Sequence, residues 1–310
     1  MERIEAFDIL KGIGIILMIV AHTYGPDSVI WDFIYAFHMP LFFIVTGFFY
    51  KQKPTLQLIK SNYNQLLLPY IALCIIVSIL SQIRQSHDIL IDIDITLNGM
   101  GPGWFLLAMF WARLELQIIL KLFPDRYLTI SLLISIIICF IADNLFISSF
   151  ISFFPSMASL FFVSIGYYIK QKHLLEIYNK NHFIFPFFCS LLWLMTSLYG
   201  KVELSQCIFK LSFIDFCGSL GGTYIAYKIS LLINKGDGVI KKILSSAGKY
   251  SLVILFFHSI DYCIPLWHNI EPYFSSSIFI FVILFLRLLF VSICLQFTLN
   301  SKILRSFFKI

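Results

Sequence analysis

About ten runs of apolar residues, each long enough to cross a lipid bilayer as a helix, follow one another along this chain. A crossing helix needs about 20 residues, because each residue adds about 1.5 Å and the hydrocarbon core is about 30 Å thick. The chain is 59% hydrophobic and only 13% charged, so its apolar surface exceeds what one soluble core can bury. We therefore predict an all-α polytopic membrane protein, with spans at 7–24, 30–50, 64–84, 103–122, 127–147, 151–169, 183–200, 208–233, 249–268 and 276–299.

The charges between these runs predict how the spans are oriented. Cytoplasmic loops of membrane proteins are enriched in Lys and Arg. If the N-terminus is cytoplasmic, most of the 23 Lys and Arg residues fall on the inner side, and the outer segments hold only Arg84, Lys201 and Lys210. If the number of spans were wrong, the Lys and Arg residues beyond the error would fall on both sides of the membrane. The alternation therefore predicts about ten transmembrane helices with the N- and C-termini both cytoplasmic.

The whole chain reads as one integral membrane domain, residues 1–310, and we expect no appended soluble domain. Its net charge of +6 comes from the inner segments, so it indicates membrane orientation, and we expect no nucleic-acid partner. The seven cysteines include no CxxC pair and lie mostly in apolar runs. That pattern favours packing roles. We expect neither a disulfide framework nor a metal site.

A histidine in the first apolar run is the strongest candidate for chemistry. His22 follows Lys11 by eleven residues, which is about three helical turns, so the two side chains share a face about 16 Å apart along the axis. Asp8 lies near the same stripe. An imidazole within a membrane is costly to keep unless it has a structural or functional use.

Further polar residues lie within the predicted spans. His38 precedes Pro40, which removes a backbone donor and tends to kink a helix. Any one buried polar residue is explained by a bond between helices, but several at comparable depth predict a polar cavity. Trp104 follows a Gly/Pro-rich turn and fits an interfacial anchor better than a substrate platform. The other polar residues within spans are Arg113, Glu115, His258 and Arg287.

Four ordered segments resemble the membrane-bound acyltransferase-3 family, whose members O-acylate sugars of bacterial surface polysaccharides and other acceptors. The first is Arg3-x4-Asp8-x2-Lys11-Gly12 with Lys11-x10-His22, and the second is Phe37-His38-Met-Pro-Leu-Phe-Phe with Thr46-Gly47-Phe. The third is Gly103-Trp104-Phe105-Leu106, and the last is Gly248-Lys-Tyr-Ser251-Leu252-x5-His258. The second segment is most similar to the fucose 4-O-acetylase-like branch. Thr46 stands where many members have Ser.

This resemblance implies a multi-pass protein of the bacterial cytoplasmic membrane and an acyl-CoA donor, usually acetyl-CoA, taken from the cytoplasm. The acceptor would be a carbohydrate or a lipid-linked glycan. His22 would be the essential histidine and Lys11 its basic partner, with Arg3 and Asp8 at the same donor end. His38, Glu115 and His258 are secondary catalytic candidates. Arg113 and Trp104 are candidates for donor binding.

Two chemical routes are open for His22. A neutral imidazole, with an ordinary pKa near 6.5, can remove the proton of a sugar hydroxyl as it attacks a thioester. Alternatively the same ring carries the acyl group as an acyl-imidazole. Lys11 would hold a CoA phosphate while the thioester reaches His22. Without the aligned histidine, Lys11 would be read as a positive-inside anchor.

Other functions fit the same residues. A transporter or flippase would use buried polar groups as a substrate or proton path. Against it, the chain shows no inverted repeat and no matching pair of broken helices. A purely structural membrane protein is the third alternative. The sequence leaves open the acceptor sugar and hydroxyl, the identity of the acyl group, the oligomeric state and the need for a partner protein.

Overall fold

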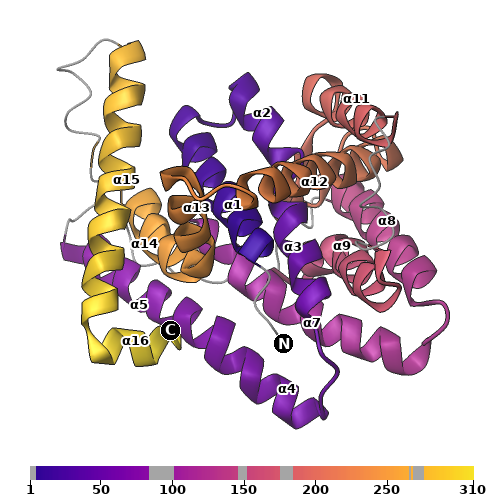
Figure 1. The fold of residues 1–310 in the computed structure, drawn as a ribbon. Helices are drawn as coiled ribbons and strands as arrows, with labels where there is room; N and C mark the ends of the chain where they lie inside the picture. Colours follow the sequence, from indigo (N-terminus) through magenta and orange to yellow (C-terminus); the bar gives the residue numbers. More distant parts are fainter. Residues whose placement is uncertain (1–4, 84–100, 146–151, 175–183, 265–266, 268–275) are drawn as a thin grey trace.

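The computed structural model describes residues 5–83, 101–145, 152–174, 184–264, 267 and 276–310. Helices occupy all ten predicted runs, and three further short α-helices of the described residues lie between or after these runs (Figure 1). The described α-helices are α1 (Glu5–Tyr24), α2 (Val29–Tyr35), α3 (His38–Phe49), α4 (Thr55–Asn62), α5 (Leu68–Ile83), α7 (Trp104–Leu122), α8 (Tyr127–Leu145), α9 (Phe153–Gln171), α11 (Ile184–Tyr199), α12 (Phe213–Asn234), α13 (Val239–Lys249), α14 (Ser251–Cys263), α15 (Ser276–Asn300) and α16 (Lys302–Phe308).

The structure supports a multi-pass membrane protein, but it does not confirm ten crossings. Among the described residues, five helices are long and apolar enough to span a bilayer, or six if the bent pair α13–α14 is one span. One physical reason is length, since α11 has 16 residues and reaches only about 24 Å. Another is charge, because α7 carries Arg113 and Glu115 in its middle. The cytoplasmic location of the two termini stays a prediction.

The predicted second span corresponds to one segment of membrane-spanning length, Val29–Phe49, which contains a short break in its helix. α2 ends at Tyr35, and α3 begins at His38 after Phe37, whose φ of −142° is not helical. Pro40 lies in the first turn of α3, where its missing N–H has no intrahelical partner to lose. The kink expected near Pro40 is therefore a helix start, which brings His38 to the N-terminal end of α3.

Glycines set the closest helix contacts. Gly47 of α3 faces Gly166 of α9, where an added Cβ would lie 1.8 Å from the Val163 carbonyl oxygen and 1.9 Å from that of Ile44, respectively. No side chain fits between backbones at that spacing, so only Gly permits it. Gly218, Gly221 and Gly222 of α12 likewise lie so close to neighbouring atoms that an added Cβ would clash, at 2.1, 2.5 and 2.6 Å.

The predicted span at 208–233 begins too early. Residues 202–209 form a small hairpin in which Val202 of β1 (Val202–Glu203) pairs with Phe209 of β2 (Ile208–Phe209). α12 starts only at Phe213. Alternating apolar residues before Asp215 suit either a strand or a helix, so the sequence pattern alone did not separate them.

α15 stands at one edge of the molecule, and α16 turns back from its end toward α14 and α5 (Figure 1). Large apolar side chains of α15 are exposed, including Phe281, Phe285 and Phe297, each at 65–67%. An exposed apolar face of this length is expected to contact lipid. The largest fully enclosed side chains of the buried core include Phe43 of α3 and Phe162 of α9.

Candidate active site

One cavity of about 600 Å³ connects the two residues that the sequence aligns, Lys11 and His22. Its walls come from α1, the end of α2, α3, α4 with the turn that follows it, α7 with the turn before it, the end of α13, α14 and the end of α16. His22, Tyr35, His38, Pro102 and Trp104 lie at one end, while lysines lie at the other. The imidazole therefore faces an internal space rather than lipid.

The lysine end of the cavity reaches the surface, because Lys51, Lys53 and Lys309 are exposed. Lys11 and Lys249 complete this group of five cations, which we call the lysine mouth. Lys11 Nζ lies 3.0 Å from Asp8 Oδ1, so Asp8 orients Lys11 and is not itself part of the cavity wall. Five clustered cations attract anionic ligands.

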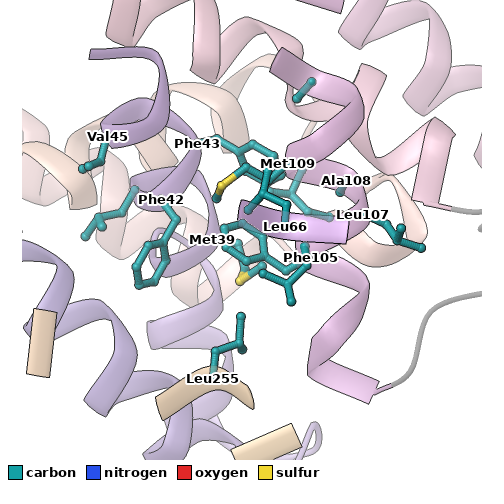
Figure 2. Close-up of a cluster of buried hydrophobic side chains, with 14 of the residues drawn as sticks. Met39, Phe42, Phe43, Val45, Leu66, Phe105, Leu107, Ala108, Met109 and Leu255 are labelled. Carbon is teal, nitrogen blue, oxygen red and sulfur yellow. The ribbon is translucent and has the colours of Figure 1, made fainter. Parts of the chain in front are cut away.

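Between the two ends the cavity wall is apolar. Figure 2 shows side chains of α3, α7 and α14 meeting here, with Leu66 from the turn before α5. Met39, Phe42, Phe105, Met109 and Leu255 line the space from these elements. Such a wall suits an uncharged, flexible arm better than a charged group.

Both ring nitrogens of His22 are hydrogen-bonded. Nδ1 lies 2.8 Å from Nε2 of His258, and Nε2 lies 2.7 Å from the Tyr35 hydroxyl. The two imidazoles are nearly parallel, with ring centres 5.1 Å apart. The rings of Trp31 and Tyr262 also contact His22, at centre distances of 5.5 and 4.8 Å. His258 is fully buried and, since it does not line the cavity, supports His22 from behind.

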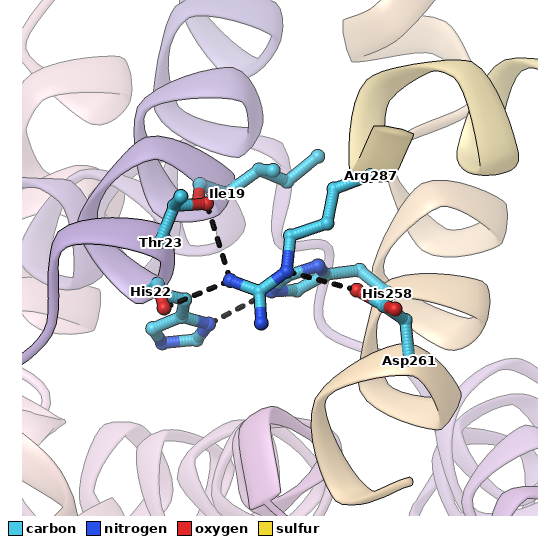
Figure 3. Close-up of polar contacts among 6 residues, drawn as sticks. All are labelled: Ile19, His22, Thr23, His258, Asp261 and Arg287. Carbon is cyan, nitrogen blue, oxygen red and sulfur yellow. Dashed lines mark hydrogen bonds and ion pairs between the residues drawn. The ribbon is translucent and has the colours of Figure 1, made fainter. Parts of the chain in front are cut away.

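A buried ion pair stands beside the two histidines (Figure 3). Arg287 Nε of α15 lies 3.1 Å from Asp261 Oδ2 of α14. Arg287 Nη1 also donates to the His22 carbonyl oxygen at 2.9 Å and to Thr23 Oγ1 at 3.1 Å. The guanidinium thus connects α15 with both α14 and the end of α1.

His38 lines the cavity, and one of its two ring nitrogens is hydrogen-bonded to the protein backbone. Its Nδ1 lies 3.0 Å from the Ile34 carbonyl oxygen, which can only accept, so Nδ1 carries the proton. In the neutral ring Nε2 is then a hydrogen-bond acceptor, and it has no partner among the described residues. Neutral His38 therefore offers the cavity a hydrogen-bond acceptor and not a donor.

Arg113 and Glu115 are near in sequence but point to different places. Arg113 lines the cavity, where Nη1 donates to Asn62 Oδ1 at 3.2 Å and to Gln65 Oε1 at 3.3 Å. No carboxylate pairs with it among the described residues. Glu115 instead accepts from Ser156 Oγ of α9 at 2.5 Å and lies outside the cavity wall. The structure thus separates Glu115 from the other candidates.

The structure gathers five of the sequence candidates, Lys11, His22, His38, Trp104 and Arg113, around one space. Asp8 and His258 each contact one of these from outside the wall. Arg3 lies outside the described residues.

Several residues around His22 were not selected from the sequence, among them Tyr35 and Asp261. Tyr35 ends the short helix α2, and Asp261 follows His258 by one helical turn. The spacing of three residues between two polar side chains in an apolar helix was the available signal for Asp261.

The described part of the chain offers few other side chains that could bind a metal ion or carry other chemistry. It contains no group of three or more His, Cys, Asp or Glu residues that could hold a metal ion, and its seven cysteines are free. Outside the membrane-spanning segments, Glu203 of β1 accepts a hydrogen bond from Ser205 Oγ at 2.6 Å. Burial raises the pKa of the Glu203 carboxyl above its ordinary value.

Comparison with known proteins assigns the chain to a family. A model of an acyltransferase domain matches residues 4–300. The chain is also 27% identical to the nodulation protein NolL of Mesorhizobium japonicum over 137 residues, which are 38% of this chain and 36% of that protein. No solved structure matches the chain. Because the family match covers nearly the whole sequence, the chain belongs to the acyltransferase-3 family, and several residues that carry the resemblance line the cavity.

Proposed function

We propose that this protein is an O-acyltransferase of the bacterial cytoplasmic membrane. It transfers an acyl group, most simply acetyl, from cytoplasmic acyl-CoA to a sugar hydroxyl. The acceptor belongs to a surface polysaccharide or to its lipid-linked precursor. The observation that carries this proposal is the single cavity with cations at one end and His22 at the other.

The cavity suits acyl-CoA in three parts. The lysine mouth would bind the nucleotide phosphates, with Lys11 oriented by Asp8. Arg113 lacks a carboxylate partner among the described residues and would bind a further phosphate oxygen deeper in the cavity. The apolar middle would take the uncharged pantetheine arm. Lys11 and His22 are about 16 Å apart along α1, which suits an extended arm with its thioester at His22.

His22 would act as the general base. Its Nε2 takes the proton of the acceptor hydroxyl, while that oxygen attacks the thioester carbonyl carbon. The tetrahedral adduct then breaks its C–S bond, the CoA sulfur receives the proton, and an oxygen ester remains on the sugar. In the structure, the Tyr35 hydroxyl is hydrogen-bonded to Nε2 of His22, and we propose that the acceptor hydroxyl takes the place of this hydroxyl.

This role requires one tautomer of the histidine pair. Nε2 of His22 can accept a proton only if the proton of the neutral ring is on Nδ1. Nδ1–H then donates to Nε2 of His258 over the observed 2.8 Å. His258 would thus fix the tautomer and the orientation of His22, as the third member of a catalytic triad does. Nε2 of His38 can accept a hydrogen bond from an amide N–H of the donor arm or from the acceptor.

The test is transfer of labelled acetyl from acetyl-CoA to glycan in isolated membranes. His22→Ala should abolish the transfer at an unchanged protein level. The control is His173→Asn, which removes an exposed histidine at the end of α9 and suits its positive φ of 50°. Persistent transfer in His22→Ala would refute the role of His22. Movement of unmodified glycan without acyl transfer would support the transporter alternative.

A further inference from the structure

Arg287 is the only charged residue of α15, a helix of 25 residues whose other side chains are mostly apolar. A charge in a membrane helix is costly unless it is paired or used. The apolar side chains of α15 are largely exposed, whereas the Arg287 side chain is 14% exposed and turns inward. Arg287 therefore contacts the protein interior rather than lipid.

Its partners lie on two other helices. Asp261 of α14 has a fully buried side chain and supplies the opposite charge at 3.1 Å. The His22 carbonyl and Thr23 hydroxyl of α1 accept from the same nitrogen, Nη1. Figure 3 shows the guanidinium between the two helices, next to both imidazoles.

The contact with α1 is made at a place where the helix needs a donor. The last four carbonyls of a helix have no intrahelical partner, and His22 is third from the end of α1. The C-terminal end of a helix also carries partial negative charge, which favours a cation there. Arg287 therefore anchors the backbone of the residue proposed as the base.

The contact with α14 is made one turn from His258. Asp261 follows His258 by three residues, so both side chains project toward α1 from adjacent turns. α1 and α14 are thus joined twice at this level. One connection is the His22–His258 hydrogen bond, and the other is the path from the His22 carbonyl through Arg287 to Asp261.

We propose that Arg287, held by Asp261, is a positioning residue for acyl transfer. It fixes the backbone of His22 relative to α14 and thereby keeps Nδ1 of His22 on Nε2 of His258. This inference rests on the proposed function of His22. A role restricted to holding α15 in place would need only the ion pair with Asp261.

Arg287→Lys separates these two roles. A lysine ammonium can pair with Asp261 but lacks the planar fork that reaches two helices at once. With labelled acetyl-CoA and saturating acceptor, kcat should fall about ten- to hundredfold, because small misplacements of a catalytic group cost about that much. The KM for acetyl-CoA should stay within about twofold, and the thermal unfolding midpoint of the purified protein should change little.

The double variant Arg287→Met with Asp261→Leu tests the same point without a buried unpaired charge. Apolar replacement of a buried ion pair is often neutral for stability. The variant should fold and still show the loss in kcat, because the contact with the His22 carbonyl is gone. Ser131→Ala, which removes the 2.7 Å bond to Ser164 between α8 and α9, is the control for a purely structural contact and should keep kcat.

Wild-type kcat in either Arg287 variant would overturn the positioning role. Loss of kcat that only follows loss of folded protein would overturn it as well. His22→Ala is measured in parallel, so that the outcomes are distinguishable. If His22→Ala is inactive and Arg287→Lys is fully active, only the positioning role fails, whereas an active His22→Ala refutes the proposed function itself.

Discussion

Replacing Gly248 by alanine should impair catalysis from a site remote from the reacting atoms. Gly248 lies near the end of α13, where that helix crosses α1. A Cβ at Gly248 would lie 1.7 Å from the Asp8 carbonyl oxygen, and one at Gly12 of α1 would lie 2.0 Å from that of Leu244. Both obstructing atoms are backbone, so neither can move without its helix.

The size of the effect follows from these distances. Ordinary contact for a Cβ begins at 3.4 Å, so the two backbones must separate by about 1.7 Å at this crossing. α14 follows α13 after a 77° bend and carries His258. The His22–His258 bond is 2.8 Å, and hydrogen bonds are weak beyond about 3.2 Å. A shift of about 1 Å at His22 is expected to lower kcat about a hundredfold, or about 2.7 kcal/mol.

The assay is the rate of labelled acetyl transfer at saturating acetyl-CoA, normalised to folded protein measured by size-exclusion chromatography. Gly238→Ala is the matched control, because Gly238 precedes the same helix, has φ of −71° and would place a Cβ with nothing within 4 Å. It should keep wild-type activity. Full activity of folded Gly248→Ala would show that the spacing of α13 and α1 does not govern the active site.

Three further substitutions probe the cavity, and a fourth, at Glu115, probes a candidate that lies outside it. Lys11→Ala should raise the apparent KM for acetyl-CoA about ten- to hundredfold, since a charge-assisted bond to phosphate contributes about 1.5–3 kcal/mol, with kcat little changed. Arg113→Met should act in the same direction, and a pure kcat defect in initial-rate measurements would contradict its donor role. Tyr35→Phe should keep kcat within about threefold at saturating acceptor, because the acceptor displaces this hydroxyl; a hundredfold loss would instead indicate proton relay. Glu115→Gln should leave both constants within about twofold and lower the unfolding midpoint by only a few degrees, because it lies outside the cavity and contacts Ser156.

Part of the site was predictable because helical periodicity is local. The spacing of Lys11 and His22 follows from 3.6 residues per turn, whatever surrounds α1. The helical segments were predictable for a similar reason, since a run of about 20 apolar residues can satisfy its backbone in lipid only within itself. Neither argument states how many helices cross the bilayer. The ten crossings predicted from the charges are not confirmed, because the described residues contain five or six helices of sufficient length and apolarity.

Partners from distant segments were not predictable in this way. Tyr35, His258 and Arg287 reach His22 from three other helices, and the last two are more than 230 residues away in the chain. Their single polar side chains looked alike in the sequence, as did Glu115, which turns toward α9 instead. Which of them met depended on the rotation of each helix about its axis.

The sequence by itself determined a membrane-embedded helical protein and an imidazole aligned with a lysine, because both depend on interactions within one helix. Only the tertiary structure decided that a cavity joins them, that His258 and Arg287 hold His22, and that Glu115 stands apart. The reason is that helix rotation is set by packing, at contacts such as Gly12 against Leu244 and Gly248 against Asp8. Those contacts exist only once the helices are assembled.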